Sequence, residues 1–356
     1  MKHKGVTFGL NLLLLLQGVF LWWCKNHPEW IEAYYARGYY PHHYELQKWF
    51  FKALPFSLGD VLYGLVIILV FRALYLGLKK RPFRIVSGFF SLTAGLSLLS
   101  LIFHLSWGLN YYRIPLHQQL NYETKYDEES LSHTLQALIE VSNQFQIRLT
   151  ENDTVPVSIP YTKDQILAMI TKEFRFESEF QYLQPHAKNA LWSIPLSYMG
   201  YAGYLNPFTL ESQVNKGLPE LSYITTTAHE MAHQLGIAAE NEANFIAFYV
   251  TINHSNPFIQ FAGYTFALRY TYSELFKANP EKAKTMIKKL HPGIFKNFST
   301  LSDYWKKYEN PFEPYLKKGY DSYLKANGQA QGIQSYNEMV ALVIAYHKKA
   351  PFLLQP

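Results

Sequence analysis

The sequence contains a single cysteine, Cys24, among its 356 residues. One cysteine excludes an intramolecular disulfide framework, and it also excludes a zinc site built from several thiolates. Whatever compartment the chain occupies, its fold is therefore held together without disulfide bonds.

Charged residues are also scarce, at 17% of the chain, against about 25% in an average soluble protein. Apolar residues make up 49% and aromatic residues 17%, which suits a protein with a large surface in or near a membrane. The net charge of +6 is not arranged as a basic stripe with interleaved aromatic residues. We therefore expect no nucleic-acid partner.

Three long apolar stretches occupy the first third of the chain, at about residues 6–24, 58–78 and 85–109. Each is long enough to cross a hydrocarbon core of about 30 Å as a helix. Their weak amphipathic period argues against the alternative, buried helices of a soluble core. The first stretch also resembles a signal peptide, but it lacks a small-residue cleavage site, and Trp22 and Trp23 suit an interfacial belt. We predict three transmembrane helices.

Basic residues predict the orientation of these helices. Lys2 and Lys4 precede the first stretch, and a basic cluster at residues 79–84 lies between the second and the third. Under the positive-inside rule both groups are cytoplasmic. The loop at residues 25–56 and everything after Asn110 are then expected outside the cytosol.

Residues 1–110 are thus expected to form a membrane region, and residues 111–356 an extracytoplasmic domain rich in α-helix with a small β-sheet. Apolar periodicity and turn residues predict helices over roughly 127–148, 163–175, 219–235, 240–254, 258–278, 280–290, 298–308, 313–326 and 335–349. Two segments rich in β-branched and aromatic residues, Thr154–Tyr161 and Ile194–Leu205, are predicted strands. The predicted fold class is mainly α.

The helix predicted at 219–235 carries the string His229-Glu230-Met231-Ala232-His233. Histidines four apart leave one face of a helix one turn apart, so both can bind one Zn²⁺ at about 2.0–2.1 Å. Glu230 lies beside the pair, where it can reach a zinc-bound water as a general base. Chance alone produces this pattern in roughly one such chain in forty. The small flanking residues and the helix end at Gly236 strengthen the interpretation.

A hydrolytic zinc site has three protein ligands and one open position. The next predicted helix begins Glu240-Asn241-Glu242-Ala243-Asn244, and we predict Glu242 as the third ligand. Glu240 is an alternative ligand, although acids here could also act as helix caps, and His254 is a further contender. The metzincin pattern would place the third ligand at Ala239, which cannot bind a metal, so that class is excluded.

The string from His229 to Phe248 resembles the gluzincin arrangement, in which a glutamate in a segment such as Glu-x-Glu-Ala-Asn completes the zinc site. More closely, the whole chain resembles an uncharacterised bacterial family of multi-pass membrane proteins with a zincin-like outer domain, that of domain of unknown function 3810. The matching segments are residues 107–113, 198–204 and 206–209, the metal segment, and Ser335-Tyr336. The resemblance implies a metal-dependent peptidase fold but brings no known substrate.

We therefore expect a membrane-anchored zinc metallopeptidase that cleaves a peptide or protein substrate outside the cytosol. One Zn²⁺ would be held by His229, His233 and Glu242, and Glu230 would take a proton from the zinc-bound water and later return it to the leaving amine. The alternative is a zinc-binding membrane sensor or scaffold with a zincin fold and no turnover. The presence of Glu230 favours the enzyme, because a site that only holds zinc does not need it.

The segment Ser193–Leu205 has two open interpretations. It could be an edge strand that binds the substrate backbone, with Gly200 and Gly203 permitting a close approach. It could equally be a turn-rich loop whose tyrosines pack on the membrane surface.

Overall fold

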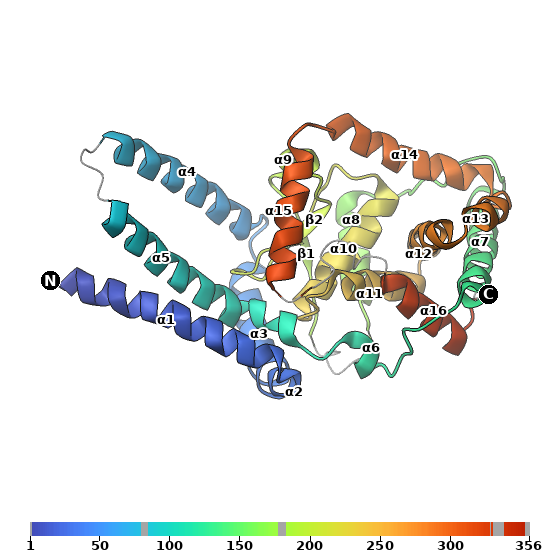
Figure 1. Cartoon of the computed structure of the whole chain (residues 1–356). Coiled ribbons are helices and arrows are strands. Elements are labelled where there is room, and N and C mark those ends of the chain that lie inside the picture. Colours follow the sequence, from blue (N-terminus) through green and yellow to red (C-terminus); the bar gives the residue numbers. More distant parts are fainter. Residues whose placement is uncertain (1, 80–84, 177–182, 328, 330–337, 353–356) are drawn as a thin grey trace. The chain divides into compact units, whose positions relative to one another are not determined.

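The computed structural model of the chain describes residues 2–79, 85–176, 183–327, 329 and 338–352 (Figure 1). The chain divides into two compact units. Unit 1 comprises residues 1–114 and 206–211, and unit 2 comprises residues 115–205 and 212–356. The boundary predicted after residue 110 lies close to the end of the first stretch of unit 1, whereas residues 206–211 were not predicted to belong to that unit.

Unit 1 contains three long apolar helices, α1 (Lys2–Lys25), α4 (Leu58–Lys79) and α5 (Ile85–Ser106). All three are long and apolar enough to cross a membrane. Only 6%, 11% and 11% of the residues in their most apolar parts are buried within the protein, so their apolar side chains are available to lipid. The three predicted apolar helices are therefore present. The basic residues 80–84, on which the predicted orientation partly depends, lie outside the described residues.

Helices α1 and α5 pack side by side (Figure 1). Gln17 of α1 is buried and donates from Nε2 to the backbone oxygen of Ser97, at 3.0 Å, and to its hydroxyl, at 3.2 Å. Thr93 of α5 donates to the side-chain oxygen of Asn11 at 2.5 Å. Polar side chains of apolar helices commonly join helices in this way, because they find no partner in a hydrocarbon environment.

The region between the first two apolar helices, residues 25–56, is largely helical. It forms α2 (Pro28–Trp30), the π-helix η1 (Ile31–Tyr39) and α3 (Tyr40–Phe51). Its tyrosines supply the apolar packing, since Tyr40 and Tyr44 are fully buried. These helices were not predicted from the sequence, because the region has a mixed aromatic and polar composition.

A buried ion pair joins η1 to the end of unit 1. Arg113, which follows the 3₁₀-helix η2 (Gly108–Tyr112), donates from Nη2 to Oε1 of Glu32 at 2.9 Å and from Nε to Oε2 at 3.1 Å. Only 5% and 4% of the two side chains are exposed. A two-pronged contact between a guanidinium and a carboxylate satisfies both charges, which are costly to bury singly.

The segment 206–211 is fastened to the first turn of α4. The Glu211 carboxylate accepts hydrogen bonds from the backbone N–H of Leu58 at 3.3 Å and of Gly59 at 2.7 Å. An acid at the start of a helix satisfies N–H groups that have no partner within the helix. A Cβ on Gly59 would lie 2.5 Å from Nδ2 of Asn206, so only glycine permits this approach.

Unit 2 is mainly helical, with a three-stranded sheet. Its helices are α6 (Leu116–Gln119), α7 (Glu128–Thr150), α8 (Lys163–Glu173), α9 (Ser193–Met199), α10 (Glu220–Gln234), α11 (Glu240–Ile252), α12 (Pro257–Ala278), α13 (Pro280–Ile287), α14 (Pro292–Tyr308), α15 (Glu313–Ala326) and α16 (Met339–Lys349). The strands are β1 (Ala187–Asn189), β2 (Gly203–Leu205) and β3 (Ser212–Val214). The sheet order is β1-β3-β2, with β1 parallel and β2 antiparallel to β3. The predicted fold class, mainly α with three apolar N-terminal helices and a small sheet, is confirmed.

The two predicted strands agree less well with the structure than the predicted helices do. Residues 154–161 form no strand, because the Asn297 side chain of α14 takes the place of a strand partner: it accepts from the N–H of Val157 at 3.0 Å and donates to its oxygen at 2.9 Å. The predicted strand Ile194–Leu205 is helical in its first half, as α9, and only β2 is a strand. Residues 335–337, where the last helix was predicted to begin, lie outside the described residues.

Helix α10 lies at the centre of unit 2, in contact with α8, α11, α12 and all three strands. Almost every side chain from Tyr223 to Gln234 is buried. Small residues such as Thr227, Ala228 and Ala232 allow the neighbouring elements to approach on several sides, and each is completely buried. The helix that carries the two motif histidines is therefore held rigidly on all sides.

Replacing Glu32 by Gln should destabilise the protein by about 3–5 kcal/mol, because it leaves the Arg113 charge buried without its counter-charge. Thermal unfolding of the detergent-solubilised full-length protein, followed by tryptophan fluorescence, measures the loss. Glu45→Gln is the control: Glu45 pairs with Lys48 at 2.8 Å, but 48% of its side chain is exposed, so the expected loss is at most about 1 kcal/mol. Equal effects of the two substitutions would contradict the prediction.

Candidate metal centre

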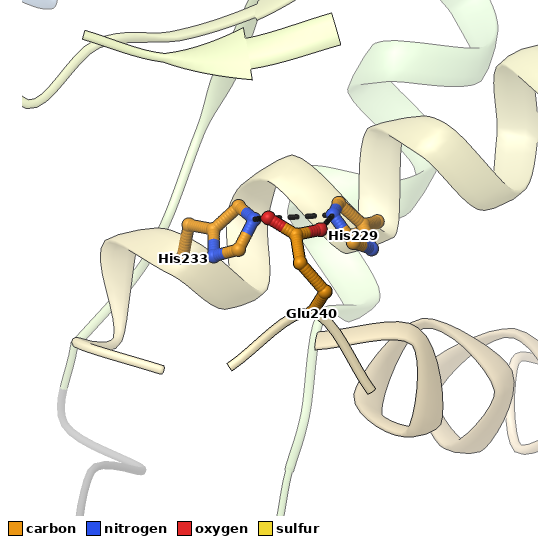
Figure 2. A group of neighbouring side chains, drawn as sticks. All are labelled: His229, His233 and Glu240. Atoms are coloured by element: carbon orange, nitrogen blue, oxygen red, sulfur yellow. Dashed lines mark hydrogen bonds and ion pairs between the residues drawn. The ribbon is translucent and has the colours of Figure 1, made fainter. Parts of the chain in front are cut away.

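Three side chains of unit 2 form a group able to hold a metal ion (Figure 2). They are His229 and His233 of α10 and Glu240, the first residue of α11, and their ligand atoms all lie within 4.8 Å of one another. Across the described part of the chain, no other group of three or more His, Cys, Asp or Glu side chains meets this geometry. The motif histidines are thus joined by one acidic residue.

A tight turn between α10 and α11 brings the glutamate to the histidines. Gly236 has a φ of 74°, a backbone conformation that glycine adopts without strain. Ala239 is extended, and α11 begins at the next residue, packing against α10. The sequence predicted this helix break, and the structure shows that it folds the second helix back on the first.

The ligand atoms converge closely. Nε2 of His229 lies 3.1 Å from Nε2 of His233 and 3.2 Å from one carboxylate oxygen of Glu240. Nε2 of His233 lies 3.9 Å from the other carboxylate oxygen. Two imidazole nitrogens and one carboxylate therefore point at a common centre.

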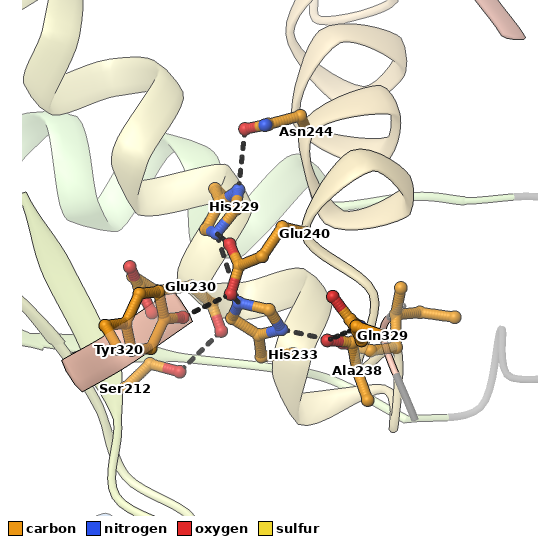
Figure 3. A network of polar contacts seen from close by, with 10 residues as sticks. Ser212, His229, Glu230, His233, Ala238, Glu240, Asn244, Tyr320 and Gln329 are labelled. Atoms are coloured by element: carbon orange, nitrogen blue, oxygen red, sulfur yellow. Dashed lines mark hydrogen bonds and ion pairs between the residues drawn. The ribbon is translucent and has the colours of Figure 1, made fainter. Parts of the chain in front are cut away.

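The other nitrogen of each histidine is held by a hydrogen bond. Nδ1 of His233 donates to the backbone oxygen of Ile237 at 2.7 Å, and Nδ1 of His229 lies 2.9 Å from the side-chain oxygen of Asn244 (Figure 3). With the proton on Nδ1, the lone pair of a neutral imidazole is on Nε2. Metal-binding histidines are oriented by contacts of this kind.

A tyrosine from α15 orients the glutamate. Tyr320 donates its hydroxyl hydrogen to Oε1 of Glu240 at 2.6 Å (Figure 3). The Tyr320 ring in turn packs edge-on against that of Tyr201, with 5.7 Å between the ring centres. Tyr320 was not predicted as a site residue. It is one of 28 tyrosines and lies 80 residues from Glu240, so no local sequence pattern connects the two.

Glu242, the predicted third ligand, does not lie at this group. Its carboxylate accepts a hydrogen bond from the backbone N–H of Leu116 at 2.6 Å. Side chains two positions apart on a helix diverge by about 200°, whereas those four apart share a face. Since Glu240 and Asn244 both face His229, Glu242 must point elsewhere. We therefore replace Glu242 with Glu240 as the candidate third ligand, the alternative that the sequence left open.

His254, the other contender, is also elsewhere. It is buried after the end of α11, where Nδ1 accepts from the backbone N–H of Asn256 at 2.9 Å and Nε2 lies 3.3 Å from the backbone oxygen of Met169. These contacts give it a structural role at the opposite end of α11 from Glu240.

Glu230 is buried beside the group, with 4% of the residue exposed. Its Oε2 has no hydrogen-bond partner among the described residues. Its backbone oxygen accepts from the Ser212 hydroxyl of β3 at 2.6 Å, which ties α10 to the sheet. A buried carboxylate oxygen without a partner is costly for stability, and such groups gather at functional sites.

Gly203 of β2 lies against the Glu230 side chain. A Cβ at this position would be 2.7 Å from Oε1 of Glu230 and 2.7 Å from the backbone oxygen of Gln213. The glycine therefore makes room for Glu230, and Gly200, with a φ of 77°, ends α9. Strand β2 lies at an edge of the sheet, and substrate binding there stays a prediction.

The group has an uneven distribution of charge. Burial raises the pKa of Glu230 to about 8 and, together with nearby His229, lowers the pKa of His233 to about 4. Burial also disfavours the charged forms of Glu240 and His229. The hydrogen bond between those two, the neighbouring charges and the remaining hydrogen bonds together outweigh burial, lowering the pKa of Glu240 to about 2 and raising the pKa of His229. Glu240 is thus anionic near neutral pH, as a candidate metal ligand should be, and Glu230 is a carboxyl group that accepts a proton readily.

Comparison with known proteins gives a family but no function. A family model described as "Protein of unknown function (DUF3810)" matches residues 35–344. No curated protein and no solved structure matches the chain. The match runs from unit 1 to the last helix of unit 2, and it confirms the family that the sequence motifs indicated.

Replacing Glu240 by Ala should remove most of the metal that the purified protein binds, because it deletes one of three ligands. Glu242→Ala should retain it, because that carboxylate is bonded to Leu116 instead. Metal content per protein chain, measured by plasma mass spectrometry, distinguishes the two. Loss of metal from the Glu242 variant but not from the Glu240 variant would restore the original ligand assignment.

Tyr320→Phe should weaken metal binding about 10–100-fold, the usual effect of removing a hydrogen bond that orients a ligand. Competition with a chromophoric chelator measures the dissociation constant. Tyr323→Phe provides the matched control, since Tyr323 lies on the same helix and is 38% exposed. The prediction fails if both variants bind metal as the parent protein does.

Proposed function

The chain belongs to the DUF3810 family of proteins of unknown function, and we propose that it is a membrane-anchored zinc metallopeptidase. The single observation that carries this proposal is the convergence of His229, His233 and Glu240 beside the buried carboxylate of Glu230. The peptide bond as substrate follows from the His-Glu-x-x-His motif, in which the glutamate acts as general base.

The donor set fits zinc. Two imidazole nitrogens and one carboxylate oxygen are the ligands of several hydrolytic zinc sites, whereas calcium and magnesium prefer oxygen ligands alone. Ligand atoms about 2.0–2.1 Å from one ion at the tetrahedral angle are roughly 3.3–3.4 Å apart. Nε2 of His229 lies 3.1 Å from Nε2 of His233 and 3.2 Å from one oxygen of Glu240, which is close to this value. Nε2 of His233 lies 3.9 Å from the other oxygen of Glu240.

The chemistry divides between the metal and the chain. When bound, zinc would supply Lewis acidity, which makes water a stronger acid and polarises a carbonyl group. Glu230 takes the proton from the attacking water on its carboxylate and delivers it to the leaving amine. Asn244 and Ile237 hold the two imidazole rings in place, and Tyr320 holds the Glu240 carboxylate. Gly203 leaves the space in which the Glu230 side chain is held.

The site is proposed to lie outside the cytosol. Lys2 and Lys4 before α1, and the basic cluster between α4 and α5, favour a cytoplasmic location for these two ends of the apolar helices. Three crossings then put everything after α5 on the other side. For a bacterial cell this side is the outer face of the inner membrane, and the substrate is a peptide or protein found there.

A zinc-binding sensor or scaffold without turnover is the second candidate. It shares the three ligands but does not use Glu230. A buried carboxylate oxygen without a partner among the described residues weakens the fold by about 1–3 kcal/mol or more. A protein that only holds zinc gains nothing in return, so this observation favours the enzyme.

Glu230→Gln should leave the zinc content unchanged and lower peptide cleavage by at least about 10²-fold, since the amide cannot accept the proton. The assay uses the full-length protein in detergent with a peptide library and mass spectrometry of the products. Glu220→Gln on the same helix is the matched control, because its side chain is 48% exposed, and it should cleave as the parent does.

The outcomes separate the two candidate functions. Cleavage by the parent and the Glu220 variant, but not by the Glu230 variant, supports the peptidase. Zinc in all three proteins with cleavage by none supports the sensor or scaffold. A parent protein that binds no zinc would refute both.

A further inference from the structure

The segment at α9 exposes more large apolar side chains than is expected for a helix facing water. Leu191, Trp192, Ile194 and Tyr198, in α9 and just before it, are 53%, 44%, 66% and 50% exposed. A surface helix of a soluble domain normally turns such residues to the core. Here all four are exposed.

The polar residues of α9 are buried instead. Ser193 and Ser197 are 6% and 3% exposed. The Ser193 hydroxyl donates to the backbone oxygen of Ala190 at 2.8 Å, and the Ser197 hydroxyl is hydrogen-bonded to that of Tyr304 at 2.6 Å. Because both serines are satisfied inside, the outward position of the apolar residues is built into the packing of α9.

Helix α15 has a second apolar face. Phe312, Tyr315, Leu316 and Tyr323 are 73%, 76%, 38% and 38% exposed. Tyr315 and Leu316 follow Phe312 by three and four residues and Tyr323 follows Leu316 by seven, spacings that align side chains along one side of a helix. The opposite side faces inward, as the fully buried Leu324 shows. Helix α15 is thus apolar on both its inner and its outer side.

The two faces adjoin one another. The backbone oxygen of Tyr198 accepts a hydrogen bond from the Asn310 side chain at 2.7 Å, and its ring packs edge-on against Tyr308 with 5.2 Å between ring centres. A Cβ on Gly200 would lie 3.0 Å from Oε1 of Glu313. We name the joint surface the α9–α15 patch; its members are Leu191, Trp192, Ile194, Tyr198, Phe312, Tyr315, Leu316 and Tyr323.

The composition of the α9–α15 patch matches a membrane interface. Tryptophan and tyrosine are enriched where a bilayer meets water, and amphipathic helices that lie in this zone combine them with lysines. Lys306, Lys317 and Lys325 of α14 and α15 have side chains 66%, 57% and 52% exposed. Each is paired with an acid of its own helix, at 3.7, 2.6 and 2.7 Å, so the match to an interface depends on the aromatic and apolar residues of the patch.

Short connections link the elements near the α9–α15 patch to the apolar helices α4 and α5. Only residues 107–114 connect α5 to unit 2. Only residues 200–205 connect α9 to the segment 206–211, which is hydrogen-bonded through Glu211 to the first turn of α4. At 3.3–3.6 Å per residue, six residues span about 20–22 Å. Both α4 and α5 are long and apolar enough to cross a membrane.

We propose that the α9–α15 patch lies in the head-group region of the bilayer that the apolar helices cross. This contact is additional to the three crossings and does not depend on metal binding or turnover. It also brings the candidate metal centre to the membrane surface, because α15 carries both the patch and Tyr320, the donor to Glu240.

Site-directed labelling of the full-length protein tests the contact. In a Cys24→Ala background, single cysteines are introduced as Ile194→Cys and Tyr315→Cys, labelled with an environment-sensitive fluorophore, and reconstituted in nanodiscs of phosphatidylcholine and phosphatidylglycerol. The matched controls are Val155→Cys and Phe276→Cys, at apolar residues of unit 2 that lie outside the patch and are 46% and 40% exposed. The two probes in the patch should be quenched several-fold more by doxyl-labelled lipids, and several-fold less by iodide, than the two controls.

Two results would overturn the proposal. Iodide quenching of the patch probes as strong as that of the controls would show that the patch faces water. Protection from iodide without quenching by doxyl lipids would show that protein covers it, as in a contact with a second copy.

A measurement on the unmodified chain guards against failure of the variants to fold. The parent protein in nanodiscs containing a photoactivatable diazirine lipid is irradiated, digested and analysed by mass spectrometry. Adducts are expected in residues 191–198 and 312–323 as well as in α1, α4 and α5. Adducts confined to the three apolar helices would refute the contact, since those helices report that the lipid reacted.

Discussion

The return of α11 onto α10 is the constraint on which the candidate centre depends. Gly236, with its φ of 74°, lets the chain reverse within a few residues, and Glu240 then starts α11 facing the two histidines. Because Asn244 lies one turn further on the same face, a single helix orientation supplies both the third ligand and the hydrogen-bond partner of His229. A rotation of α11 by one residue, about 100°, would remove both contacts together.

That arrangement concentrates ionisable groups between two largely buried helices, α10 and α11. Moving charges out of water is unfavourable unless they are paired. Within the group, Glu240 and His229 offset each other across 3.2 Å, Tyr320 adds a hydrogen bond, and Glu230 responds to burial by holding a proton up to a pKa of about 8. A divalent cation bound by the same three side chains would neutralise more of this cluster, so metal binding and stability of unit 2 are linked.

Features that depend on residues close together in the sequence could be predicted, whereas features that depend on distant residues could not. The apolar helices and most helices of unit 2 follow from local composition and periodicity, and the motif at His229–His233 is contained in one helical turn. The failures involve partners distant in sequence. Asn297 replaces a strand partner for Val157, and Tyr320 reaches Glu240 from another helix. The choice between Glu240 and Glu242 required the rotation of α11, although the spacing of Glu240 and Asn244 was a usable signal for it.

Helix α15 has one side in the interior of unit 2 and another side on the surface. Its inner side is held by Leu324 in the core and by Tyr320 at the candidate centre, while its outer side presents Tyr315 and Leu316, 76% and 38% exposed. In water such a helix would leave apolar surface exposed to solvent, which is unfavourable. At a bilayer surface the same residues become stabilising, and the energy gained there would hold α15 against the centre. The Tyr320–Glu240 contact would then be strongest when the protein is in its membrane, which connects the apolar helices of unit 1 to the chemistry of unit 2 through lipid.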